Sequence, residues 1–179
     1  SLDERVERAL EKSEENLRRL KKRSEEVLEE VKEAIKELKR RSREALEDVR
    51  RVLDELRKDG LDERVLEKLR EDVERVHKRN EEILEEVERR VRRVHEDNKR
   101  LLDEVRDDSD KVVKRLRRVD AKVVEELIKR VEEINTRLNE KVKKSIDDVR
   151  RIIEEVRRRV EKTIRDVERI KEEVERRRR

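Results

Sequence analysis

Apolar residues recur along the chain at spacings of three and four residues, and charged residues separate them. This spacing places the apolar side chains on one face of an α-helix, so the pattern predicts long amphipathic helices. With two or three apolar positions in every seven, each helix has a stripe wide enough for one packing seam. Because a lone helix cannot bury such a stripe, we expect the helices of the chain to pack against one another.

Three segments share a sequence typical of a helix start, in which charged and apolar residues follow an aspartate. They begin at Asp3, Asp62 and Asp120. Aspartate is a favourable N-cap because its carboxylate accepts hydrogen bonds from the free amides of the first turn. At the start of the first helix, Ser1 and Glu4 could form a capping box instead. The first helix also has a clear end, since Lys58-Asp59-Gly60 combines a basic last turn with a glycine that can take a left-handed conformation.

The second boundary has two interpretations. Residues 107–110 have the composition of a turn, but the apolar spacing continues through them, and their acidic side chains would oppose the helix dipole at a C-terminus. Residues 114–118 are rich in cations, which suit a helix C-terminus. We therefore place the turn near residues 119–120, although neither glycine nor proline occurs there.

The predicted fold is all-α, a single-chain, antiparallel, up-down-up bundle of three long helices. We expect these helices at about residues 2–58, 62–118 and 121–178, in one domain over residues 1–179.

Each predicted helix repeats its sequence after 18 residues. The segment that begins at Ser24 recurs at Ser42, and the segment that begins at Ser145 recurs at Thr163. Eighteen residues make five turns of a regular helix, so the apolar stripe stays aligned and the helices are expected to be nearly straight.

Polar residues occupy or flank several positions of the apolar stripe, where a polar group without a partner costs about 1–3 kcal/mol. In antiparallel neighbours, residues at one height have a constant sum of residue numbers. On this basis His77 meets Ser42 and Thr163, and His95 meets Ser24 and Ser145. We predict two copies of one cluster, about 27 Å apart along the helices, and a third, less regular cluster. The predicted members are Ser42, His77, Asn80 and Thr163 (the His77 cluster), Ser24, His95, Asn98 and Ser145 (the His95 cluster), and Ser13, Asn16, Ser109 and Asn135 (the Ser13 cluster).

Composition excludes several classes of function. Of the 179 residues, 60% are charged, and none is aromatic, cysteine, methionine or proline. Without cysteine the chain has no disulfides, no thiolate nucleophile and no zinc or iron–sulfur site of the usual kind. No apolar run exceeds two residues, so we expect a soluble protein without a membrane span or targeting segment, cytoplasmic when expressed recombinantly.

The charges favour an ion-paired surface over a nucleic-acid interface. The net charge of +4 is the difference between 56 cations and 52 anions that are interspersed along the chain. Nucleic-acid binding favours a basic stripe, often with aromatic side chains for stacking, and neither is present. We therefore expect no nucleic-acid or membrane partner.

The serine–histidine pairs also raise the question of catalysis, with Ser42 or Ser24 as nucleophile and the imidazole as base. No glycine-rich loop is present to form an oxyanion hole. His77 and His95 are about five turns apart on one helix, so they cannot share a metal ion. We expect no enzyme, and no catalytic, metal or cofactor site.

These features resemble the family of computationally designed helical bundles with buried hydrogen-bond networks. The resemblance covers the whole chain and rests on equal helices, aspartate caps, Leu/Val/Ile cores, Glu/Lys/Arg surfaces and repeated polar layers. It implies a synthetic, monomeric structural scaffold, related to coiled coils, that has no natural activity and requires no partner. In that family, histidine-containing networks are associated with pH-responsive disassembly.

Two alternative functions follow. In a pH-responsive bundle, buried neutral His77 and His95 would make stability fall as the pH drops through the range in which imidazole protonates, about pH 6.5. In a binding module, an external partner would displace one helix, although no weaker seam or long linker marks such a helix. A designed homo-oligomer, or helix exchange with a partner, is a less favoured assembly.

Overall fold

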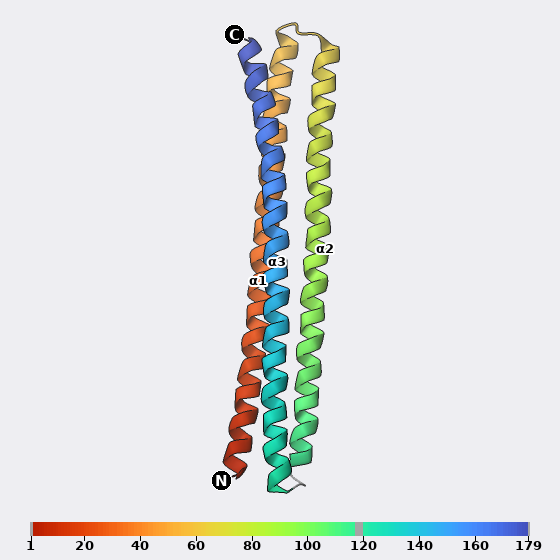
Figure 1. Ribbon diagram of the computed structural model, residues 1–179. Helices are drawn as coiled ribbons and strands as arrows, with labels where there is room; N and C mark the ends of the chain where they lie inside the picture. The colour runs from red at the N-terminus through yellow and green to blue at the C-terminus, as the bar shows by residue number, and fades with distance from the viewer. Residues whose placement is uncertain (1, 117–119, 179) are drawn as a thin grey trace. The chain divides into compact units, whose positions relative to one another are not determined.

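The computed structural model describes residues 2–116 and 120–178, and in these residues the chain forms three α-helices and no strand. The helices are α1 (Leu2–Lys58), α2 (Glu63–Leu116) and α3 (Ala121–Arg178), and they pack against one another as a three-helix bundle (Figure 1). The predicted all-α three-helix fold is confirmed. No described helix is apolar enough over a sufficient length to cross a membrane.

The chain divides into two compact units, and each takes a segment from every helix. Unit 1 consists of Ser1–Glu30 and Val91–Arg150, and unit 2 consists of Val31–Arg90 and Arg151–Arg179. Within each unit the α2 segment runs antiparallel to the segments of α1 and α3 (Figure 1). The expectation of one domain over residues 1–179 stays a prediction.

The turn between α1 and α2 is built from the residues that mark it in the sequence. The amide of Gly60 donates to the carbonyl of Arg57 (3.2 Å), and the amide of Leu61 donates to the carbonyl of Leu56 (3.3 Å). This pattern is a Schellman motif, which requires a left-handed residue after the helix. Gly60 has a φ of 87° and supplies it.

The aspartates at the helix starts do not all have the same role. Asp62 is an N-cap, since its Oδ1 accepts a hydrogen bond from the amide of Arg64 (3.0 Å). Asp120 precedes α3, and its carbonyl accepts from the amide of Val124 (3.1 Å). Asp3 was expected as an N-cap, but α1 begins one residue earlier, so Asp3 lies inside the first turn, where its charge complements the helix dipole.

The second turn lies between Leu116, the last described residue of α2, and Ala121, the first residue of α3. Residues 107–110 are helical, so the alternative turn at that position is wrong. The expected C-terminal residues 117 and 118 of the second helix, and Val119 of the expected turn, lie outside the described residues.

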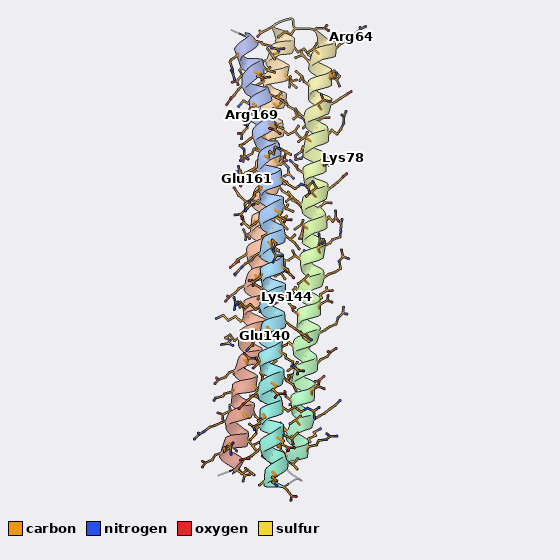
Figure 2. All side chains as sticks on the ribbon, in the orientation of Figure 1. Arg64, Lys78, Glu140, Lys144, Glu161 and Arg169 are labelled. Atoms are coloured by element: carbon orange, nitrogen blue, oxygen red, sulfur yellow. The ribbon has the colours of Figure 1, made fainter. Side chains whose placement is uncertain are left out.

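The core of each unit consists of leucine, valine and isoleucine from the three stripes. In unit 1 it includes Leu20, Val91 and Val142, and in unit 2 it includes Leu84 and Val160, all 5% exposed or less. Burying one such side chain contributes about 1.5–3 kcal/mol, so these stripes drive the association of the helices. Charged side chains cover the outer surfaces of the helices (Figure 2).

Candidate functional site

The His77 cluster in unit 2 joins all three helices through a continuous series of hydrogen bonds. The hydroxyl of Ser42 on α1 lies 2.9 Å from Nδ1 of His77 on α2, and Asn80 Nδ2 donates to Ser42 Oγ at 3.3 Å. The carboxamide of Asn80 also bonds Thr163 on α3, at 2.8 Å from Nδ2 and 3.0 Å from Oδ1. Nε2 of His77 lies 3.0 Å from the Glu81 carboxylate.

These contacts indicate which tautomer of a neutral His77 ring suits the cluster. The Glu81 carboxylate only accepts hydrogen bonds, so Nε2 of His77 carries the proton directed at it. Nδ1 of a neutral ring then accepts the Ser42 proton, while Ser42 Oγ accepts the amide proton of Asn80. Ser42 and Asn80 are only 4% and 3% exposed, so water does not reach most of their polar atoms. The hydrogen bonds within the cluster satisfy these atoms instead.

The His95 cluster in unit 1 has the same residue types and a different bonding pattern. Ser24 Oγ lies 3.0 Å from His95 Nδ1, and Asn98 Nδ2 donates to Ser145 Oγ at 3.1 Å. These are two separate pairs, one between α1 and α2 and one between α2 and α3. Lys99 takes the sequence position that Glu81 has beside His77. The expectation of two identical clusters is therefore wrong in its bonding pattern, although the same kinds of residue meet.

The Ser13 cluster in unit 1 brings together three of its four predicted members. Ser13 Oγ and Asn16 Nδ2 on α1 both donate to Oδ1 of Asn135 on α3, each at 3.4 Å. Nδ2 of Asn135 donates to the Val131 carbonyl at 3.1 Å. Within the described residues Ser109 makes no hydrogen bond to this cluster; it lies on α2 at the wall of a groove that Ser13 also lines.

Two polar residues near these clusters, Glu81 and Asn139, were not among the predicted members. Glu81 was identifiable, because a carboxylate four residues after a histidine lies on the same helix face. Asn139 has a buried Oδ1 without a hydrogen-bond partner, and it borders a cavity of about 140 Å³ in unit 1. No sequence signal separates Asn139 from a surface asparagine, because its place depends on how far the helix is rotated.

Ion pairs link the helices outside the core. The Glu74 carboxylate on α2 accepts from Arg50 on α1 (2.9 Å) and from Arg70 on its own helix (3.4 Å), which lowers the pKa of Glu74, with Arg50 the larger cause. Hydrogen bonding to Arg40 likewise lowers the pKa of Glu37. Exposed pairs of this kind contribute about 0–1 kcal/mol each, so they add little to the free energy of folding.

Ser42, His77 and Glu81 place a hydroxyl, an imidazole and a carboxylate in line, as hydrolase triads do. A catalytic serine needs room for a substrate and donors for an oxyanion. Ser42 is 4% exposed, and the cavity beside it has a volume of about 10 Å³. The geometry suits hydrogen bonding within a core.

The described residues contain no group of three or more histidine, aspartate or glutamate side chains placed to hold a metal ion. Serine, asparagine, threonine and histidine side chains make the hydrogen bonds of the three clusters. No family model, curated protein or solved structure matches the chain.

Proposed function

We propose that the protein is a de novo designed structural scaffold without natural biochemical activity, in which buried polar clusters fix the register of the helices. The observation that carries this proposal is the hydrogen-bonded path from Ser42 on α1 through Asn80 on α2 to Thr163 on α3. Polar groups that satisfy one another across three helices specify one alignment.

The physical basis is the cost of a slip between helices. An apolar seam of similar side chains packs almost as well after one helix shifts by a turn, whereas a shift here would separate Asn80 from both its partners. Each buried polar group left unpaired costs about 1–3 kcal/mol. Apolar stripes thus provide the stability, and the clusters provide the specificity.

A designed origin is supported by the regularity of the chain. The 18-residue period occurs in all three helices, and the polar residues of the His77 and His95 clusters follow it. Helix-forming charged residues fill the surface, and 60% of the chain is charged. The interior is built from few residue types, without any aromatic side chain.

We further propose that the protein is a monomer and not an enzyme. Apolar side chains from the stripes of α1, α2 and α3 fill the core of each unit, which supports a chain that folds without a second copy. The small cavity beside Ser42 leaves a substrate no access to that hydroxyl.

The test replaces the His77 cluster by apolar residues, as Ser42→Ala, His77→Leu, Asn80→Leu and Thr163→Val. We expect the melting temperature to stay or rise, while amide NMR spectra show several sets of peaks from different registers. A matched surface variant, Thr136→Val, should retain one set. A single set of peaks in the fourfold variant would contradict the role in register.

A second candidate function is a pH-responsive bundle, and the observation that favours it is the contact between a buried serine hydroxyl and Nδ1 of each histidine, at 3.0 Å for His95 and 2.9 Å for His77. In a neutral ring whose Nδ1 carries no proton, this nitrogen accepts the serine proton. A protonated ring has no acceptor. The serine would have to turn and accept from the ring, which leaves its own proton without a partner. The unfolded chain meets no such cost and takes up protons more readily, so stability should fall as the pH drops through about 6.5.

The two histidines should contribute unequally to this response. A charged His77 ring gains the attraction of Glu81 at 3.0 Å. His95 borders a small cavity that is also lined by Lys21, Glu25 and Lys99. Two cations and one acid therefore face this ring, and they give a positive charge on it no net attraction.

We expect His95→Asn to remove more of the acid sensitivity than His77→Asn, in urea midpoints measured at pH 5 and pH 7.5. If the double variant keeps the full pH dependence of the parent, the histidines are not the switch.

A further inference from the structure

The Ser13 cluster differs from the other two clusters in the space beside it. A groove of about 370 Å³ lies in unit 1 between residues 10–21 of α1 and residues 102–113 of α2. Two spaces, of about 10 Å³ and 120 Å³, border the His95 cluster, and one of about 10 Å³ borders the His77 cluster. The groove beside the Ser13 cluster is therefore the widest of these four spaces.

The 18-residue repeat explains why the groove is open. Ser109 holds the position that Val73 and Val91 hold in the preceding repeats, and those valines are 1% and 3% exposed. Ser13 likewise replaces a valine that is buried in the next two repeats of α1. Val113 holds the position of the two histidines. Smaller side chains stand at all three positions, and the volume that they leave is the groove.

The walls of the groove combine an apolar surface with two hydroxyl groups. Leu10, Leu17 and Leu102 are among the apolar lining residues. Ser13 is 2% exposed and reaches Asn135 only at 3.4 Å, near the long limit of a hydrogen bond. Ser109 makes no hydrogen bond within the described part of the chain, so its hydroxyl is free to donate into the groove.

Charged side chains surround the groove in equal numbers of each sign. A balanced rim gives no net attraction for an anion or a cation, so it suits a neutral ligand. The charged lining residues are the cations Arg18, Lys21 and Arg106 and the acids Glu14, Asp103 and Asp110.

We propose that this groove binds a neutral, mainly apolar molecule, about the size of two fused six-membered rings, whose carbonyl accepts a hydrogen bond from Ser109. The volume lies within the range of about 300–1,000 Å³ that small-molecule pockets occupy, and it exceeds the cavity of about 150 Å³ that holds benzene in an engineered protein. This site is independent of the role of the clusters in register.

A neutral fluorescent naphthyl ketone, 6-propionyl-2-(dimethylamino)naphthalene, is the probe for the test. Its emission moves to shorter wavelength when it leaves water. We expect a saturable blue shift with one probe per chain, and amide NMR shifts confined to residues near 10–21 and 102–113. Absence of a saturable shift, or shifts centred on the exposed Leu61 and Val65 at the first turn, would overturn the proposal.

Variants of Ser109 separate volume from hydrogen bonding. Ser109→Val restores the valine of the other repeats and fills the groove, so binding should weaken at least about tenfold. Ser109→Ala keeps the volume and removes the donor, so binding should weaken less, while the blue shift remains. Thr136→Val makes the same hydroxyl-to-methyl change at an exposed site of unit 1 and should leave binding unchanged.

Circular dichroism melts show whether each variant keeps its fold. Ser109→Val should melt at or above the parent temperature, because it fills space in an apolar wall. Binding to Ser109→Val as tight as to the parent would overturn the proposal. If Ser109→Val melts below the parent, Leu17→Phe is the second variant that fills the groove, and unweakened binding there has the same consequence.

Discussion

Asn80 shows how much one side chain can contribute to alignment. Its carboxamide, on α2, bonds Ser42 on α1 and Thr163 on α3, and the side chain is 3% exposed. Asn98 is its equivalent one repeat later, 8% exposed, and among the described residues its amide bonds Ser145 alone. The same residue type therefore holds three helices in one unit and two in the other, because the neighbouring hydroxyls lie at different distances.

This difference predicts unequal costs for the same substitution. Asn80→Ala removes bonds to two helices and leaves Ser42 and Thr163 short of partners, so it should lower the free energy of unfolding by about 2–3 kcal/mol. Asn98→Ala should cost about 1 kcal/mol, because a single bond is lost. Urea unfolding of the two variants at neutral pH measures both values. Equal losses would show that the bonding patterns of the two clusters are alike.

At the scale of elements, the turn between α1 and α2 was the most predictable feature. Glycine, with φ of 87° at Gly60, and aspartate, at Asp62, act through their own backbone and side chain, so local sequence is sufficient to locate them. The acidic residues 107–110 looked like a turn and are helical, because the stripe that continues through them is anchored by packed neighbours such as Val105. Tertiary packing outweighed local composition there.

In unit 2, the ion pairs of Glu74 with two arginines at the seam between α1 and α2 can be tested one at a time. Glu74 accepts from Arg50 across the seam and from Arg70 within α2, and its pKa is lowered mainly by Arg50. Arg50→Gln should raise the pKa of Glu74 more than Arg70→Gln does, as measured by carboxyl ¹³C titration. A larger effect of Arg70→Gln would show that the lowered pKa of Glu74 arises mainly from the ion pair within α2.

The sign of the resulting pH effect follows from that lowered pKa. A carboxyl that ionises more readily when folded adds stability above its unfolded pKa, and this stability is lost as the pH falls through the folded pKa. The contribution should therefore disappear on the acid side of about pH 4.5 and be small, since the Glu74 side chain is 40% exposed. Measured against the parent, Arg50→Gln should flatten the plot of stability against pH in that range and leave its slope unchanged near pH 6.5, where imidazoles titrate.

For the whole molecule, the sequence predicted which residues meet more reliably than how they bond. Matching residue numbers between antiparallel helices brought Ser42 to His77 and Ser24 to His95, because helix rise is constant. Bond lengths depend on rotamers and helix rotation, which is why the third cluster lacks Ser109. The groove had a sequence signal all the same, since serine replaces valine of the other repeats at residue 109.

Both units depend on α3 for part of their core. Each unit takes one of its three segments from α3, and Val142 and Val160, in units 1 and 2, are both 0% exposed. The burial of several such side chains at about 1.5–3 kcal/mol each exceeds the 5–15 kcal/mol that a whole domain usually retains. A chain ending at residue 116 should therefore lose its cooperative thermal transition and aggregate, whereas we expect the full chain to sediment as a monomer. Adding a separate peptide of residues 121–178 should restore the helical signal at a one-to-one ratio. A truncated chain that stays monomeric and melts cooperatively would show that α1 and α2 form a stable pair without α3.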